Sequence, residues 1–210
     1  MARQRASDTE SIINAAARVF ERKGYSDTTI DDIATEAKVS KPTIYQYAKG
    51  KQWLLETIVD RVIYSLRDQI NEIVESDLTS GEKLEHYVYA CVRSATRLRT
   101  YFAVLFSDQT ALTPLAQRRF RDFARESDAA VRAILKDCVA DGTVRDDIDL
   151  GVAVRLLNGM LTSVHRWYRG RAPNALDPDQ IAEEALKMLR GLMLTPRTRP
   201  VARKTTGSKT

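Results

Sequence analysis

The side chains best suited to binding chemistry lie between Ala37 and Leu55. Four lysines and no acidic residue occur in this segment, which therefore has an excess of positive charge. Ammonium groups neutralise phosphate, and hydroxyl groups donate to phosphate oxygens and base edges. Hydroxyl-bearing Thr43, Tyr45 and Tyr47 stand among the lysines. These residue types predict a surface that contacts a nucleic acid.

Two short helices are expected to position these side chains. The first begins with Thr28 or Thr29 as N-cap, and acidic residues follow at 31 and 32, where the helix dipole favours negative charge. Its apolar face follows helical spacing and comprises Ile30, Ile33, Ala34 and Ala37. A helix of this kind would brace the segment that follows it.

The second helix is expected to open at Ser40, which is a good N-cap, with Pro42 in its first turn. Ile44 should point inward, which leaves outward-facing Lys41, Thr43, Tyr45, Gln46 and Tyr47. Two short helices in this order form a helix-turn-helix, whose second helix enters the major groove of DNA. The alternative is an ordinary helical hairpin with a solvated basic face.

The same segment resembles the N-terminal domain of the TetR family of bacterial transcriptional regulators. The resemblance spans about residues 8–56 and depends on Gly24-Tyr25, Thr28-Thr29-Ile30, Asp32-Ile33-Ala34, Ala37-Lys38-Val39-Ser40-Lys41, Thr43-Ile44-Tyr45, Tyr47 and Lys51. It implies that double-stranded DNA is held by Thr29, Lys41, Pro42, Thr43, Tyr45, Gln46, Tyr47 and Lys51.

Two positions depart from the pattern of this family. Lys38 stands in the turn where the family usually has glycine, so either this residue is left-handed, with strain of roughly 1 kcal/mol, or the turn differs. Ala48 stands where a large aromatic residue is common, which predicts looser packing under the recognition helix.

Composition argues against an enzyme, a metal site and a bound cofactor. The 210 residues include two histidines at unrelated positions, and there is no phosphate-binding glycine loop, metal-binding Cys/His spacing or Gly-x-Ser-x-Gly motif. Cys91 and Cys138 are expected to be core thiols. No apolar run approaches 18 residues and no signal peptide is evident, which predicts a cytoplasmic protein without a membrane span.

The net charge of +5 is concentrated at the C-terminus. Residues 195–210 carry five basic and no acidic side chains, whereas the rest of the chain is balanced. This tail is expected to be disordered, and its role is either non-specific DNA attraction or solubility. At the other end, Arg3 and Arg5 precede the first helix, either as an arm for the minor groove or as a disordered segment.

Helical periodicity continues along the rest of the chain, and no segment shows the alternation of a strand. The expected helices span about 8–23, two within 28–47, 51–75, one around Leu84–Cys91, 100–108, 114–140, 150–168 and 177 or 178 to 194. We therefore predict an all-α fold, with a three-helix DNA-binding domain at 1–50, a six-helix ligand-binding and dimerisation domain at 51–194, and a tail at 195–210.

The last two helices are more apolar than a monomer requires, with apolar residues from Val152 to Trp167 and from Ile181 to Met193. The surplus predicts a second apolar face, on which two copies would form a four-helix interface. The TetR resemblance implies the same homodimer, which would read a palindromic operator with two recognition helices.

A small-molecule effector is the remaining expected partner. Its candidate contacts are the aromatic and polar residues around the middle helices: Tyr87, Tyr101, Phe102, Phe106, Phe123, His165, Arg166, Trp167 and Tyr168. For each of them, ordinary core packing is the alternative. The run His165–Arg171 combines cations with two stacking rings, and it resembles TetR-family regulators that respond to acyl-coenzyme A thioesters. A helix C-terminus also favours cations without any ligand.

Together these features predict a ligand-responsive repressor, released from its operator by a small apolar effector, with an acyl-CoA thioester as one candidate. The alternative is a constitutive DNA-binding or architectural protein without an effector.

Overall fold

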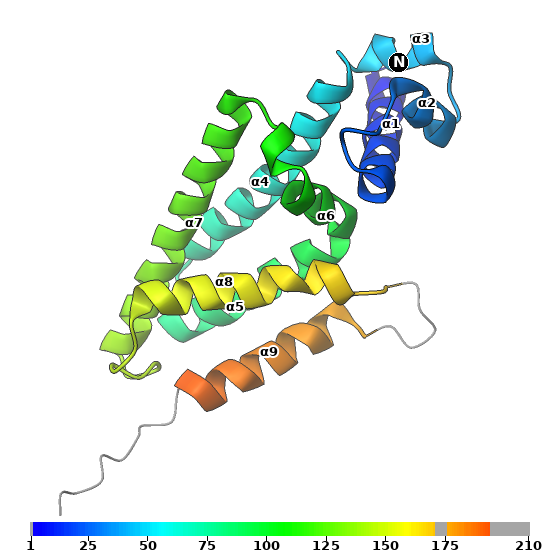
Figure 1. The fold of residues 1–210 in the computed structure, drawn as a ribbon. Helices are drawn as coiled ribbons and strands as arrows, with labels where there is room; N and C mark the ends of the chain where they lie inside the picture. The colour runs from blue at the N-terminus through cyan, green and yellow to red at the C-terminus, as the bar shows by residue number, and fades with distance from the viewer. Residues whose placement is uncertain (1, 171–175, 194–210) are drawn as a thin grey trace, which may run out of the picture.

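The computed structural model describes residues 2–170 and 176–193, and every secondary-structure element in these two ranges is helical. We call α1–α3 the N-terminal domain and α4–α9 the C-terminal domain. Figure 1 shows the N-terminal domain at one end of the molecule and α8 and α9 on the far side of the C-terminal domain. The predicted all-α architecture is confirmed. The elements are α1 (Ala2–Lys23), α2 (Ile30–Ala37), α3 (Lys41–Tyr47), α4 (Lys51–Glu75), α5 (Ser80–Arg97), α6 (Arg99–Ser107), the 3₁₀ turn η1 (Gln109–Ala111), α7 (Pro114–Ala140), α8 (Leu150–Trp167) and α9 (Pro178–Met193).

The N-terminal domain packs around the apolar stripe of α1. Ile12, Val19 and Phe20 of this stripe are all buried, as are Ile33 of α2 and Ile44 of α3. Helices α2 and α3 are too short to be stable alone, so burial of their apolar side chains against α1 holds the domain together. Ala48, the C-cap of α3, is also buried. It occupies the position where a large aromatic residue is common in the family that this segment resembles.

One predicted feature of this domain is wrong. The first helix begins at Ala2 rather than near Asp8, so residues 2–7 extend α1 and form neither an arm nor a disordered segment. No proline or glycine interrupts these residues, and the helix therefore continues toward the N-terminus.

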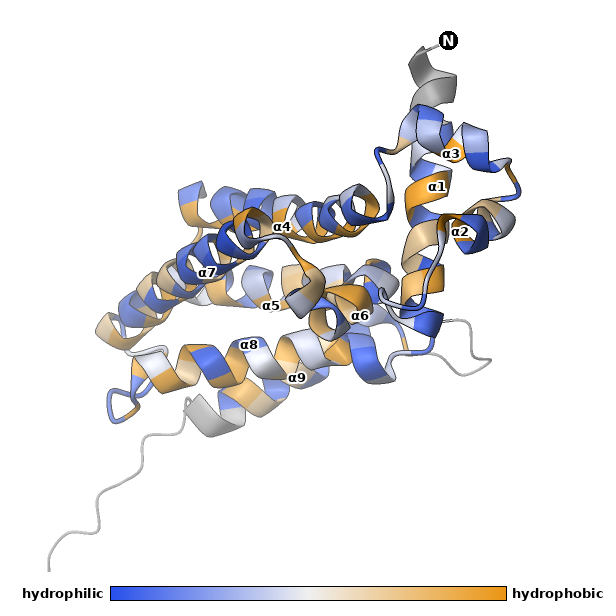
Figure 2. Ribbon diagram, turned by 45° about the horizontal axis from the view of Figure 1, so that its top comes forward, coloured by the Kyte–Doolittle hydropathy of each residue, from blue (hydrophilic) through white to orange (hydrophobic). Residues whose placement is uncertain are grey.

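The C-terminal domain is arranged around α5, which packs against α4, α7, α8 and α9. An apolar row at i, i+4 spacing is buried along α4 and consists of Leu54, Ile58, Val62, Leu66 and Ile70. In Figure 2 the hydrophobic residues of these helices lie mainly on the faces that meet inside the bundle. Cys91 and Cys138 are buried free thiols, as predicted. No helix in the described ranges is long and apolar enough to cross a membrane.

The turn between α2 and α3 contains a strained residue. Lys38 has φ 58° and ψ 40°, which is the left-handed region. Its N–H donates to the carbonyl of Thr35 at 3.2 Å, and the N–H of Val39 donates to the carbonyl of Ala34 at 3.0 Å. The first of the two expected alternatives at Lys38 is therefore correct: the turn keeps its shape, and a lysine takes the conformation that glycine adopts most easily.

We expect Lys38→Gly to raise the free energy of unfolding by up to about 1 kcal/mol, because glycine removes the steric cost of a left-handed Cβ. Lys38→Ala keeps the Cβ and is the matched control, so it should give no such gain. Both values come from urea unfolding followed by circular dichroism. Equal stabilisation by glycine and alanine would show that the lysine charge, not its backbone, is the cause.

Candidate nucleic-acid interface

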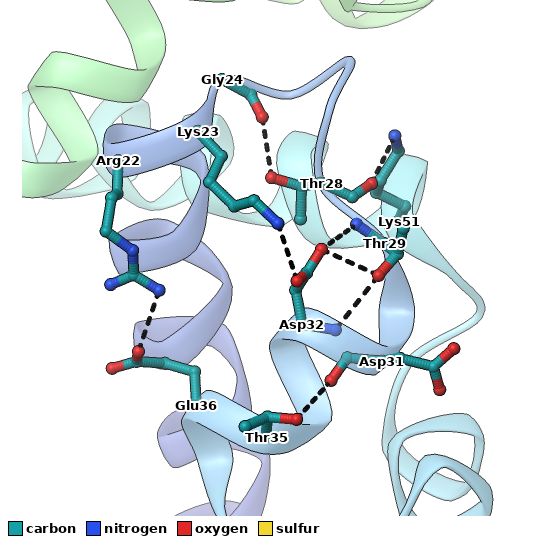
Figure 3. Close-up of polar contacts among 10 residues, drawn as sticks. All are labelled: Arg22, Lys23, Gly24, Thr28, Thr29, Asp31, Asp32, Thr35, Glu36 and Lys51. Atoms are coloured by element: carbon teal, nitrogen blue, oxygen red, sulfur yellow. Dashed lines mark hydrogen bonds and ion pairs between the residues drawn. The ribbon is translucent and has the colours of Figure 1, made fainter.

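Helix α2 is fixed at its start by a capping box between Thr29 and Asp32. The N–H of Asp32 donates to Thr29 Oγ1 at 3.1 Å, and the N–H of Thr29 donates to Asp32 Oδ2 at 2.9 Å. Lys23, the last residue of α1, donates to the same carboxylate at 2.8 Å (Figure 3). These bonds, the one from Lys23 first, hold the pKa of Asp32 well below its usual range. The carboxylate thus ties the end of α1 to the start of α2.

A second carboxylate joins the same two helices. Glu36 accepts from Arg18 Nε at 2.7 Å and from Arg22 Nη2 at 3.2 Å. Hydrogen bonding from Arg18 is the main cause that lowers the pKa of Glu36. Because α2 is held at both ends against α1, the following helix is presented at a fixed angle.

Helix α3 begins as the sequence predicts. Ser40 is the N-cap, and its Oγ accepts from the N–H of Thr43 at 3.3 Å. Pro42 occupies the first turn, where its missing N–H costs nothing. Ile44 is completely buried and anchors the helix to the core. The seven-residue helix thereby turns its other faces to solvent.

The outward surface of α3 consists of Lys41, Pro42, Tyr45 and Gln46, all exposed. Tyr45 is 55% exposed although its ring is large and apolar. Its hydroxyl makes no hydrogen bond to any described residue. Lys41 is bonded to Asp31 at 2.9 Å, which raises the pKa of its ammonium group. This exposed ion pair is weak, so a phosphate can replace the carboxylate.

Three other predicted DNA contacts have hydroxyls that are engaged within the domain. The Oγ1 of Thr29 belongs to the capping box, and that of Thr43 lies 2.8 Å from Ser40 Oγ. Tyr47 is partly buried and its hydroxyl donates to Asp8 Oδ2 at 3.2 Å. Tyr47 thereby joins α3 to α1, and the DNA contacts of these three residues stay predictions.

Lys51 is also engaged within the protein, by hydrogen bonds to the loop between α1 and α2. Its ammonium group, predicted to contact phosphate, donates to the carbonyls of Tyr25 and Thr28, both at 2.8 Å, and of Ser26 at 3.2 Å. It also lies 4.4 Å from the centroid of the Tyr25 ring. All three N–H donors are used, because the loop between α1 and α2 turns its carbonyls toward the start of α4. In this structure Lys51 holds that loop, and its contact with phosphate stays a prediction.

Two lysines that were not singled out as contacts are better placed for phosphate. Lys38 and Lys49 are exposed, and neither side chain has a hydrogen bond or ion pair with another described residue. They flank α3 on both sides. Beyond Lys49, Gly50 is the N-cap of α4, with φ 131° and no side-chain cap, so the first backbone N–H groups of α4 are available to an anion. Lys38 and Lys49 are identified as candidate phosphate contacts by their exposure and by the lack of an acidic partner among the described residues. The sequence alone shows only their charge.

In the part of the chain that the structure describes, the residues predicted to bind an effector lie in separate places. Phe102, Phe106 and His165 form a cluster in which the His165 ring is stacked on Phe106 with centroids 5.2 Å apart. Tyr87 and Phe123 are buried in the core, where Tyr87 donates to Asn158 Oδ1. Both rings pack in the core, and their contact with an effector stays a prediction.

The remaining candidates lie at the C-terminal end of α8 and beside α6. Arg166 and Trp167 are exposed. Tyr101 and Tyr168 instead line a cleft of 920 Å³ between the two domains. The hydroxyl of Tyr101 donates to Asn14 Oδ1 of α1 at 2.8 Å. The sequence thus predicts the C-terminal end of α8 as part of a binding site. It does not predict that the cleft beside this end is lined by α1.

Comparison with known families decides the identity of this fold. Residues 12–58 match the family model for bacterial regulatory proteins of the TetR family, and residues 77–193 match the tetracyclin repressor-like C-terminal domain. The chain belongs to the TetR family. It is therefore a DNA-binding transcriptional regulator and not an enzyme, as the sequence predicts.

Relatives and solved structures agree with this assignment. The HTH-type transcriptional repressor KstR2 of Mycolicibacterium smegmatis is 24% identical over 189 residues, covering 90% of this chain and 91% of the relative. KstR2 of Rhodococcus jostii is 26% identical, covering 88% and 90%. The structure of the ketosteroid transcriptional regulator KstR2 of Mycobacterium tuberculosis superposes with a TM-score of 0.82 at 19% identity, covering 90% of this chain and 95% of that one.

The contrast between Lys51 and Lys49 is testable. We expect Lys51→Met to lower the free energy of unfolding by about 1.5–3 kcal/mol, because three carbonyls lose a charged donor. Lys49→Met should leave stability unchanged but weaken DNA binding and reduce the salt slope by about one. Urea unfolding and fluorescence anisotropy at several salt concentrations measure the two effects. If Lys51→Met behaved like Lys49→Met, Lys51 would be a phosphate contact after all.

Proposed function

We propose that this protein is a cytoplasmic homodimeric repressor that a small effector releases from a palindromic operator. The observation that carries the proposal is the solvent-exposed surface of α3, which consists of Tyr45, Gln46 and Lys41 together with Pro42. Lys38 and Lys49 flank it and supply phosphate contacts, while the α3 side chains reach base edges. In this proposal residues 1–50 bind DNA, 51–194 bind the effector and form the dimer, and 195–210 are an accessory tail.

Dimerisation through α8 and α9 is supported by an exposed apolar face. Val152 is 55% exposed and Leu156 68%, and Trp167 follows on the same side of α8. On α9, Met188 is 57% exposed. Both helices pack against α5 and lie at one edge of the molecule (Figures 1 and 2). Side chains of this size are costly to leave in water, and a second copy would cover them.

The apolar part of an effector would be recognised by the cluster of Phe102, Phe106 and His165. Burial is the main cause that lowers the pKa of His165, so its imidazole is neutral near pH 7 and stacks as an uncharged ring. Phe106 is 40% exposed, which opens the cluster to solvent. KstR2 of Mycobacterium tuberculosis is described as a ketosteroid regulator, so a bulky apolar effector is a consistent class.

An acyl-CoA thioester is the specific candidate for such an effector. The apolar acyl group would reach the aromatic cluster, and Arg166 with Trp167 would lie beside the polar part. The effector would change operator affinity only by binding two orientations of the N-terminal domain unequally.

The α3 surface can be tested with a matched pair of tyrosines. Tyr45 on α3 and Tyr64 on α4 are both 55% exposed. We expect Tyr45→Ala to weaken operator binding roughly tenfold to a hundredfold, as loss of a base or phosphate contact does, with no change in thermal stability. Tyr64→Ala should leave operator binding unchanged. Fluorescence anisotropy with a promoter fragment gives both affinities, and unchanged binding by Tyr45→Ala would refute the assigned surface.

The dimer face can be tested in the same way. Leu156 on α8 and Leu115 on α7 are exposed to similar extents, 68% and 64%. We expect Leu156→Glu to give a monomer at micromolar concentration, since a buried unpaired carboxylate is expensive, and Leu115→Glu to remain dimeric. Light scattering after size exclusion measures the mass. A dimeric Leu156→Glu protein, or a dimer lost through Leu115→Glu, would place the interface elsewhere.

A further inference from the structure

The cleft described above lies between the two domains. The cleft of 920 Å³ has walls from α1, from the middle of α4, from the junction of α5 with α6, and from the segment after α8. A cavity of this size is ample for an organic ligand rather than a single small ion. It meets a second cavity of 410 Å³ at Tyr168, Thr96 and Arg97, which line both. The two openings form an elongated groove.

The cleft is strongly positive. Its charged lining consists of two glutamates, Glu10 and Glu21, and five arginines: Arg18, Arg61, Arg97, Arg99 and Arg169. Arg61 is paired with Glu10 and Arg99 with Glu21, and Arg18 is paired with Glu36 outside the cleft. Positive charge therefore remains after the ion pairs are counted.

The excess belongs to Arg97 and Arg169, which have no acidic partner in the part of the chain that the structure describes. Arg97 donates to Ser65 Oγ at 2.9 Å, and Arg169 donates to the carbonyls of Arg166 and Tyr168, both at 3.0 Å. Both side chains are exposed. A guanidinium group has five N–H donors in a planar fork that matches a phosphate group, so each retains donors for a ligand.

The backbone after α8 is fitted to this place. At Gly170, an added Cβ would lie 2.8 Å from Cε1 of Tyr168, which is closer than such contacts allow. The chain thus passes directly over the Tyr168 ring, and the ring is held as a wall between the two cavities. Glycine at this position allows Arg169 and Tyr168 to face the groove together.

We propose that this interdomain cleft binds an organic ligand with two or more phosphate groups, of the nucleoside-diphosphate type, with Arg97 and Arg169 as phosphate-binding residues. The inference rests on the proposed effector response, and it places the charged part of the effector at the boundary between the domains. An apolar extension of the ligand is not required for the phosphates to bind.

The position of the cleft gives the ligand a route to the DNA-binding surface. The ion pairs of Arg61 with Glu10 and of Arg99 with Glu21 both join the C-terminal domain to α1. A polyanion in the cleft repels the two glutamates and competes for their arginines. Binding therefore weakens the contacts that fix the N-terminal domain, and operator affinity falls.

The test uses the full-length protein, with coenzyme A, inorganic pyrophosphate and phosphate-free adenosine as probes, titrated by calorimetry at constant ionic strength. We expect saturable binding of coenzyme A and none of adenosine. The double variant Arg97→Gln, Arg169→Gln should bind coenzyme A at least tenfold more weakly. The matched control is Arg118→Gln, Arg121→Gln, two exposed arginines of α7 outside the cleft, which should bind within twofold of the parent.

The probes also distinguish the sources of the anion. Pyrophosphate binding as tight as that of coenzyme A supports an inorganic polyphosphate ligand, whereas much weaker pyrophosphate binding supports an organic one. The proposal is overturned if neither phosphate compound binds, or if the control variant loses as much affinity as the cleft variant.

Operator binding separates this inference from the proposed function. The Arg97→Gln, Arg169→Gln protein should bind its promoter fragment with the affinity of the parent, but coenzyme A should no longer weaken that binding. Loss of the coenzyme A effect in the variant alone supports the cleft. A parent protein whose operator affinity coenzyme A leaves unchanged contradicts the regulatory role, and a parent that binds no operator contradicts the proposed function itself.

Discussion

The arrangement of the two domains depends on the hydrogen bonds that the Lys51 ammonium group donates to three backbone carbonyls. Lys51 at the start of α4 holds the loop that connects α1 to α2, and Tyr25 of that loop is held in turn. The Tyr25 hydroxyl donates to Gln52, and its backbone N–H donates to Asp108 at the end of α6. One loop of the N-terminal domain therefore contacts two helices of the C-terminal domain. The orientation of α3 thus depends on contacts with α4 and α6 as well as on its own domain.

A second set of contacts along α1 is of a different kind. The ion pairs at Arg61 and Arg99 and the hydrogen bond between Tyr101 and Asn14 are polar and partly exposed. Contacts of this type are individually weak and sensitive to nearby charge. The N-terminal domain is thus attached by several hydrogen bonds at the loop and by weaker polar contacts along α1.

The sequence predicted the fold well because its local patterns are strong. Capping residues, helical periodicity and the buried row of α4 each require only neighbours along the chain, and Ser40 and Thr29 act as expected. The features that the sequence does not show depend on distant residues. Lys51 donates to carbonyls more than twenty positions away along the chain, and a charge count cannot show these hydrogen bonds. The cleft unites four separate segments, so its arginines appear unrelated in the sequence.

The uninterrupted length of α4 has a mechanical consequence. Its 25 residues form a rod of roughly 37 Å at 1.5 Å per residue. A rotation of about 5° around the far end would displace the near end by roughly 3 Å, which is close to the spacing of successive base pairs. A helix of this length would convert a small rotation, one that breaks no helix, into a shift of the N-terminal domain by about one base pair along the duplex.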